Sequence, residues 1–531
     1  MKFNSWFTQD GIRRPKSVTY CGVCSSKPLN QKTNQLMRLL ILLPLMLFAI
    51  ACKRGDDTPL KNKEKFEKEH PDFATKFKNK VRDIYTEKEM QGDFIFAVVD
   101  ENGLAYSFAL NREILKGEES SLDNDTPIYI ASSTKSFTGT LLKILEQENV
   151  LDLNNSLQEY LPKLNYSDSI ETQNIAIKNL LNHTHGTFST SMTWKTAFLG
   201  YSGGNDELIE DLNNDFLYDL SGNYRYSNVG PIISGMVAEE MTGKTWKALM
   251  KEHIFTPLQM ENTSTNVSDY AIEDIRPSLT VTKERGVIEK GLYKSDITMH
   301  ASGGIISTIN DLSKWLTANI NQDSVLLNND SWSDLHTATT PQDKKYYTYQ
   351  RTGYSLGWDI AEYQNEKILT RFGGLAGISF HISFMPDKKV GIVAFSNDNR
   401  AYLLPHLMVN YAYNLINEQS ADSILNIEKT GFDKSFKRED DIQYPDDSDM
   451  LPANKDNDNI IGTYESTTNW PTIEINQKDD HYIFKWGVLE GKIYSTEDEG
   501  YMSNLGVLSR DFKIENDTLI SGSLAYKRVN P

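Results

Sequence analysis

Apolar residues recur along this chain with two different periods, and these periods predict the first elements of a folded domain. Phe77, Val81 and Ile84 are spaced by four and three residues, which predicts an amphipathic helix. The segment DFIFAVVDENGLAYSFAL then places two apolar runs around Asn102-Gly103, a dipeptide that strongly favours a β-hairpin. We therefore expect a helix and a hairpin to open the domain.

The same patterns predict a helix in the middle of the domain and strands near its end. A helical apolar face begins just after Ser132 and ends near Asn149. Much later, SFHISFMPDKKVGIVAFSN predicts two strands joined by a turn at residues 386–389, and YLLPHLMVNYAYNLINE predicts a helix. Strands at both ends with helices between them describe an α/β fold whose first and last strands share one sheet.

Changes in composition divide the chain into five parts. Residues 1–52 are an N-terminal extension with a signal segment, and residues 53–71 are polar and charge-mixed, as a solvated tether is. The main domain is expected at residues 72–418, followed by an acidic linker at residues 419–458. Residues 459–531 alternate apolar and polar positions between Gly and Asn-Asp turns, which predicts a small all-β domain.

Composition and charge narrow the classes of function. The 531 residues are 39% hydrophobic and 24% charged, the proportions of an ordinary globular protein. The formal net charge of -18 repels phosphate backbones and anionic lipid surfaces. Nucleic-acid binding is therefore not expected.

The three cysteines lie in the N-terminal extension, at Cys21, Cys24 and Cys52, so the rest of the chain holds no disulfide or thiolate site. Met37 to Cys52 reads MRLLILLPLMLFAIAC, too short to span a bilayer comfortably and typical of a secretory signal, with Met37 a candidate start. Its end resembles the lipobox of bacterial lipoproteins. In these proteins signal peptidase cuts before the cysteine, which becomes the first residue of the mature protein and carries diacylglycerol. This implies an exported lipoprotein anchored at Cys52 on the periplasmic face of a membrane or at the cell surface; an uncleaved signal anchor is the alternative.

The segment IASSTKSF contains the only Ser-x-x-Lys in the chain, Ser132 to Lys135. Residues three apart on a helix lie on one face, so the ammonium of Lys135 can reach the hydroxyl of Ser132. Backbone N–H groups at a helix start also favour a developing oxyanion. The motif therefore predicts a nucleophilic serine, and a capping serine beside a surface lysine is the alternative.

The surrounding segments carry a family resemblance. TPIYIASSTKSFTGTLLKILEQENVLDLNNSLQEYLPKL closely resembles the nucleophile region of the β-lactamase-related family, which includes class C β-lactamases, DD-carboxypeptidases and related esterases. IKNLLNHTHGT and SGGIISTINDLSKWL resemble two further segments of that family, so the resemblance covers about residues 75–417. It implies a β-lactamase/transpeptidase-like antiparallel sheet flanked by helices, with an all-helical region, and an acyl-enzyme formed on Ser132.

The family's second motif is Tyr-x-Asn, which Tyr226-Ser227-Asn228 supplies ahead of a predicted helix. Tyr363-Gln364-Asn365 also matches this pattern, but it lies too near the third motif to be the second one. The resemblance implies that Tyr226 and Lys135 take the proton of the nucleophile and that Asn228 hydrogen-bonds Lys135 and the substrate. A nearby cation makes a phenol a usable base.

The third motif departs from the family pattern. Where the family usually has Lys-Thr-Gly or His-x-Gly, this chain has Arg371-Phe372-Gly373. The resemblance implies that the N–H of Gly374 pairs with that of Ser132 as an oxyanion hole. Arg371 keeps a positive charge that can meet a carboxylate through two hydrogen bonds, so we expect it, with Gly373 and Gly374, to contact substrate.

The sequence thus predicts a serine hydrolase acting on amide or ester bonds of cell-wall peptides, β-lactams or small esters. The altered third motif supports one alternative, an inactive relative that binds peptidoglycan-type peptides without turnover. His183 and His185 lack a partner at helical metal spacing, so neither a metal nor a cofactor is expected.

Overall fold

The computed structural model describes residues 58–165, 171–201, 204–214, 217–218, 221–291, 293–466, 468, 470–496, 500–506 and 508–529. Cys52 and the predicted signal segment lie outside these residues. In the part of the chain that is described, no helix combines the length and apolar character needed to cross a bilayer.

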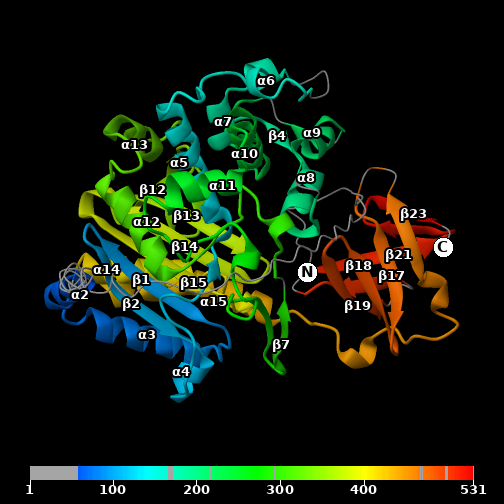
Figure 1. Ribbon diagram of the computed structural model, residues 1–531. Helices are drawn as coiled ribbons and strands as arrows, with labels where there is room; N and C mark the ends of the chain where they lie inside the picture. The colour runs from blue at the N-terminus through cyan, green and yellow to red at the C-terminus, as the bar shows by residue number, and fades with distance from the viewer. Residues whose placement is uncertain are drawn as a thin grey trace, which may run out of the picture.

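A nine-stranded antiparallel sheet forms the centre of the main domain (Figure 1). Eight strands follow the order β10-β11-β12-β13-β14-β15-β1-β2, and β9 pairs with β11. The first strand pairs with the last, Phe94 opposite Ser396, which confirms the expected sheet. The strands are β1 (Phe94–Asp100), β2 (Gly103–Leu110), β9 (Thr340–Pro341), β10 (Lys345–Tyr346), β11 (Tyr349–Tyr354), β12 (Asp359–Tyr363), β13 (Glu366–Leu375), β14 (Ile378–Met385) and β15 (Val390–Ser396).

Helices cover both faces of this sheet because its central strands are apolar on both sides. Along β1, Ile95 and Ala97 pack into one core, and Phe94 and Phe96 into the other, as alternation across a strand requires. The first core includes α5 (Thr134–Gln147), α10 (Val229–Thr242) and α12 (Ile309–Asn321); the second includes α3 (Phe73–Glu87) and α14 (Leu404–Ile416).

An all-helical region lies between β2 and β9 (Figure 1). Short strand pairs interrupt it: β3 (Ile128–Tyr129) with β8 (Ile306–Ser307), β4 (Thr187–Phe188) with β5 (Leu217–Tyr218), and β6 (Ser278–Thr282) with β7 (Gly286–Gly291). Its further helices are α4 (Arg112–Lys116), α6 (Leu157–Tyr160), α7 (Ile177–Leu181), α8 (Thr190–Trp194), η3 (Lys195–Leu199), α9 (Asn205–Asn214), α11 (Trp246–Met250), η4 (Lys251–Phe255) and α13 (Asn329–His336).

The expected tether is wrong from Thr58 onward, because Thr58–Glu69 forms helix α2. Phe66 on this helix is buried, with its ring 5.1 Å from that of Phe73 and 6.2 Å from that of Tyr106. A single aromatic residue among many charged ones gave no periodic signal in the sequence. The folded domain therefore begins before residue 72.

The expected acidic linker is also wrong over its first half. Ala421–Asp440 forms helix α15, which packs on α14. Leu425, Phe432 and Phe436 are buried on one side of it, and Arg400 Nη1 donates to Asp440 Oδ1 at 2.8 Å. The charged residues of this segment form the solvated face of the helix. The linker between the main domain and the C-terminal domain therefore begins after α15.

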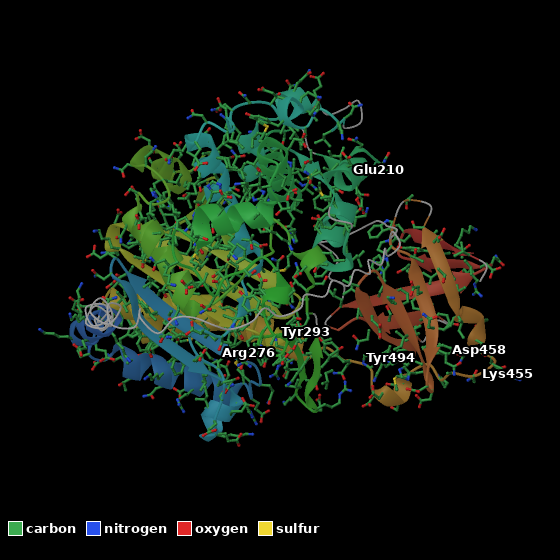
Figure 2. The ribbon with its side chains drawn as sticks, viewed as in Figure 1. Glu210, Arg276, Tyr293, Lys455, Asp458 and Tyr494 are labelled. Atoms are coloured by element: carbon green, nitrogen blue, oxygen red, sulfur yellow. The ribbon has the colours of Figure 1, made fainter. Side chains whose placement is uncertain are left out.

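The C-terminal domain is a closed eight-stranded antiparallel barrel, which confirms the small all-β domain. Its strands are β16 (Gly462–Ser466), β17 (Ile473–Lys478), β18 (His481–Trp486), β19 (Leu489–Ser495), β20 (Tyr501–Asn504), β21 (Ser509–Glu515), β22 (Thr518–Ser521) and β23 (Leu524–Val529). The turn after β18 meets the main domain, where Val488 N donates to Leu199 O at 3.1 Å and the rings of Trp486 and Trp194 lie 5.4 Å apart. In Figure 2, Tyr293 lies on the main domain and Tyr494 on the barrel.

Candidate active site

Ser132 lies where a strand turns into a helix. Strand β3 leads into the 3₁₀ turn Ala131–Ser133, which continues directly as α5. Ala131 takes a φ of 45°, a left-handed conformation that is uncommon for alanine. This sharp turn presents Ser132 one helical turn before Lys135, and Lys135 Nζ donates to Ser132 Oγ at 3.1 Å.

The ammonium of Lys135 is buried among uncharged acceptors. Besides Ser132 Oγ, it donates to Asn228 Oδ1 at 2.8 Å and to Ser302 O at 2.9 Å. Ser302 Oγ donates to the same Asn228 oxygen at 2.8 Å. Burial lowers the pKa of Lys135 to about 8, with the positive charge of Arg371 acting in the same direction and Tyr226 opposing it. A substantial fraction of Lys135 is therefore neutral near pH 8 and able to accept a proton.

Tyr226 completes the group around the nucleophile. Lys135 Nζ lies 4.9 Å from the centre of its ring, and Arg371 Nη2 lies 3.5 Å from its hydroxyl oxygen. Burial acts to raise the pKa of this phenol. The positive charges of Lys135 and Arg371 lower the pKa, and so do hydrogen bonds with Lys135 and Ser132. The net effect is a pKa below the usual value of a tyrosine. Tyr226 and Lys135 therefore form a coupled pair that can share one proton.

Arg371 is buried in an internal ion pair, which corrects the expectation that its guanidinium is available for a substrate carboxylate. On β13, its Nη1 donates to Asp359 Oδ2 at 2.8 Å and to Tyr354 Oη at 3.1 Å, and only 2% of the residue is exposed. Its Nη2 faces Ser132 O at 3.4 Å. A buried guanidinium needs a paired carboxylate, and Asp359 on the neighbouring strand provides it.

Gly373 and Gly374 let β13 approach the nucleophile turn. A Cβ at Gly373 would lie 2.2 Å from Ile130 O, so any side chain there would push the strand away from the turn. Gly374 is exposed at the same edge, and a Cβ there would lie 2.9 Å from Tyr402 Oη. The backbone of Gly373 is thus close to the serine turn, and Gly374 follows it on the same strand.

Three contributors to the site were not foreseen from the sequence: the carbonyl of Ser302, the carboxylate of Asp359 and the ring of His183. Ser302 begins one of the segments used for the family resemblance, which was a signal for its location but not for its contact with Lys135. Asp359 lies outside every motif. The His183 ring lies 4.7 Å from that of Tyr226, so it packs behind the base.

The other candidates lie away from the nucleophile. Tyr363 Oη donates to Glu428 Oε1 at 3.0 Å and packs with α14 on the opposite face of the sheet. His185 Nδ1 is 2.6 Å from Thr187 Oγ1. Across the described segments, no group of three or more His, Cys, Asp or Glu side chains is arranged to hold a metal ion.

Comparison with known proteins identifies the family of this fold and site. The family model described as Beta-lactamase matches residues 77–404, which is more than half of the chain. The chain belongs to the beta-lactamase family. This membership supports a serine-hydrolase type of chemistry in general.

Two curated relatives of this beta-lactamase family protein are similar over part of their length. It is 25% identical over 309 residues to unguisins hydrolase ungD' of Aspergillus campestris, covering 56% of this chain and 56% of that one. It is 25% identical over 305 residues to Protein flp of Staphylococcus aureus, covering 57% of this chain and 59% of that one. The chain thus spans little more than half the length of these relatives.

Solved structures show the same fold. The octameric penicillin-binding protein homologue from Pyrococcus abyssi is 18% identical with a TM-score of 0.57, and covers 85% of this chain and 99% of its own. The D-amino acid amidase from Ochrobactrum anthropi SV3 is 18% identical with a TM-score of 0.54, and the match covers 66% of this chain and 99% of the amidase chain. A mutant class C beta-lactamase is 18% identical with a TM-score of 0.51, and the match covers 67% of this chain and 98% of the beta-lactamase chain.

Proposed function

We propose that this protein is a serine hydrolase that forms an acyl-enzyme on Ser132. The observation that carries the proposal is the position of Lys135, whose Nζ lies 3.1 Å from Ser132 Oγ while its other acceptors are also uncharged. A buried amine with a lowered pKa is a suitable base for a serine hydroxyl.

The mechanism follows from these contacts. Ser132 Oγ attacks the carbonyl carbon of the substrate, and its proton passes to the Lys135–Tyr226 pair. The tetrahedral intermediate collapses when the pair returns that proton to the departing amine or alcohol, which leaves an acyl ester on Ser132. Water then attacks the ester, gives a proton to the same pair, and releases the acid product as Ser132 regains its proton.

The backbone N–H groups of Ser132 and Gly374 are proposed to stabilise the oxyanion. Ser132 lies at the start of α5, where backbone N–H groups are directed toward a developing negative charge. The absence of a side chain at Gly373 supports this role, because it allows β13 to lie against the serine turn.

The proposed substrates are amide or ester bonds of cell-wall peptides, β-lactams or small esters. One name among the similar proteins supports amide substrates, the D-amino acid amidase, and the name unguisins hydrolase supports hydrolysis in general. We also propose that the protein is exported and anchored to a membrane through a lipid on Cys52, based on the signal segment that ends at this cysteine.

The second candidate is a relative that binds such peptides without turnover. Its supporting observation is Arg371, which stands in place of the family's Lys or His and is held by Asp359. A wide guanidinium does not reproduce the compact ammonium or the titrating imidazole at that position.

Covalent labelling separates the two candidates. The protein is incubated with a fluorophosphonate probe and with a labelled penicillin, and intact and peptide mass spectra are recorded. We expect an adduct on Ser132 that is absent from Ser132→Ala, a change that removes the hydroxyl that accepts from Lys135 Nζ. A folded wild-type protein that both probes leave unlabelled would favour the binding protein, and an adduct persisting in Ser132→Ala would place the nucleophile elsewhere.

A further inference from the structure

A separate cavity of about 230 Å³ lies in the all-helical region. It is enclosed by α9, α10, α11 and the loop that precedes β8. Its apolar wall consists of Leu208, Ile232, Met236 and Met299. Ser132, Lys135 and Tyr226 do not line it, so it is distinct from the reacting centre.

Three charged side chains line this cavity, Glu239, Asp296 and Lys247, and Glu239 and Lys247 form no ion pair with each other. Glu239 Oε1 accepts a hydrogen bond from Trp246 N at 2.7 Å, and burial raises the pKa of its carboxyl. Lys247 Nζ donates to Asn266 Oδ1 and to Asp296 O, both at 2.8 Å. Both hydrogen-bond acceptors of Lys247 are uncharged; burial lowers the pKa of its ammonium, and the carboxylates of Asp296, Asp269 and Glu239 oppose that shift. An ammonium has three donors. The cavity wall therefore offers an anion and a cation that a ligand can satisfy.

The size of the cavity sets the size of the ligand. It is larger than the ~150 Å³ cavity that holds benzene in an engineered protein and smaller than the roughly 300 Å³ at which sites for drug-sized ligands begin. One apolar group with two charged ends fits this description. The indole N–H of Trp246, which also lines the cavity, has no hydrogen-bond partner among the described residues, and an acceptor on a ligand would satisfy it.

We propose that this cavity binds a free α-amino acid with an aliphatic side chain. The ligand carboxylate accepts from Lys247, its ammonium donates to Glu239, and its side chain packs against Met236 and Met299. The zwitterion has no net charge, so the overall negative charge of the protein does not oppose its entry. This site goes beyond the proposed hydrolysis and does not depend on it.

The cavity adjoins the loop that holds the catalytic lysine. His300 and Ala301 line it, and the next residue, Ser302, supplies the carbonyl that accepts from Lys135. Ala301 O itself accepts from Thr138 Oγ1 on α5 at 2.6 Å. An amino acid in the cavity would thus rest against the back of the active-site loop.

Calorimetry with leucine tests the proposal. The full chain is titrated with L-leucine and D-leucine, and with N-acetyl-leucine and leucinamide, in which one charged end is blocked. We expect at least one free enantiomer to bind, and both blocked analogues of that enantiomer to bind at least about tenfold more weakly, as the loss of a charged hydrogen bond predicts. No binding of either free enantiomer would overturn the proposal.

Matched variants locate the binding. Glu239→Gln keeps an oxygen to accept from Trp246 N, and Lys247→Met keeps the length of the stem; each should weaken leucine binding at least about tenfold. The controls Glu240→Gln, on α10, and Lys251→Met, at the start of η4 directly after α11, change exposed neighbours and should bind as the wild type does. Thermal melting verifies that each variant is folded.

An active-site variant provides the opposite control. Tyr226→Phe removes one hydroxyl beside Ser132 and should leave leucine binding unchanged. If Tyr226→Phe abolishes binding while folded Glu239→Gln and Lys247→Met retain it, the ligand occupies the catalytic cleft and the proposal is wrong. Labelling of Ser132 by a fluorophosphonate is measured separately, so failure of this site and failure of the proposed hydrolase are distinguished.

Discussion

Asp359 determines what Arg371 can do. Its carboxylate accepts from Arg371 at 2.8 Å through one oxygen and from Arg351 at 3.1 Å through the other. Arg371 is thereby held with one nitrogen toward Tyr226, and its guanidinium is buried. We therefore expect the substitution in the third motif to alter the electrostatics of the base more than the recognition of substrate.

The lowered pKa of Lys135 predicts the pH dependence of turnover. The pair of Lys135 and Tyr226 must lose a proton before it can act as a base, so kcat/KM should rise with pH and level off above the pKa. Because burial lowers the pKa of Lys135 to about 8 from the usual 10.5, the midpoint should lie near 8. A pH profile with an ester substrate measures it, and a midpoint near 10.5 would contradict a buried, neutral amine.

Arg371→Ala should reduce turnover of charged and neutral substrates alike. Its guanidinium is tied to Asp359, so carboxylate-bearing peptides and simple esters should both lose about ten- to hundredfold, as for a lost charged contact. Because Arg371 lowers the pKa of both Lys135 and Tyr226, its removal should move the midpoint of the pH profile upward.

Arg351→Ala is the matched control for this change. It removes the second arginine that pairs with Asp359 but leaves Arg371 in place, so the pH midpoint should move less. A selective loss on carboxylate-bearing substrates in Arg371→Ala, with no change in the pH profile, would return Arg371 to the role of a substrate anchor.

At the scale of elements, helix α15 belongs to the main domain although its sequence reads as a charged linker. Phe432 is fully buried against the second core, whereas Ile427 on the same helix is 75% exposed. The buried side chains are too sparse to outweigh the surrounding charges in a sequence pattern, but they have a complete packing surface on the folded domain.

Phe432→Ala should destabilise the protein by about 3–5 kcal/mol, the usual cost of removing a buried phenylalanine. Ile427→Ala on the exposed face of α15 should change stability by less than about 0.5 kcal/mol. Chemical denaturation of both variants measures the difference. Equal and small effects would show that α15 is not part of the cooperative unit.

At the scale of the whole molecule, the barrel covers part of the main domain. A Cβ at Gly487, in the turn after β18, would lie 2.3 Å from Leu199 O, so the turn and helix η3 are in close contact. Trp486 lies against Trp194 at the same junction. The main sheet and both of its helical layers are nevertheless complete by α15.

A chain ending at Met450 should fold and melt cooperatively, but at a lower temperature than the full chain. The loss follows from exposure of Trp194 and Leu199, which the barrel contacts. Hydrogen exchange should show lost protection confined to α8, η3 and β7, the elements that the barrel contacts. Aggregation of the shortened chain would mean that the barrel is required to form the main core.

Cys52→Ser should release the protein from membranes if a lipid on this cysteine is its anchor. The test is fractionation of cells that express the full chain, with Cys24→Ser as the matched control, which should stay with the membranes. Recovery of Cys52→Ser in the membrane fraction would contradict a lipid anchor at this residue.

The sequence by itself determined the hairpin, the strands of the sheet, the all-β tail and the family of the nucleophile, because local periodicity and short motifs carry those signals. Ser132 and Lys135 are one helical turn apart, so their contact follows from spacing alone. Only the tertiary structure decided that Asp359 binds Arg371 and that α2 and α15 pack on the domain. Those contacts join residues that share no motif. A contact between distant segments does not change the apolar periodicity of either segment, so the sequence pattern cannot reveal it.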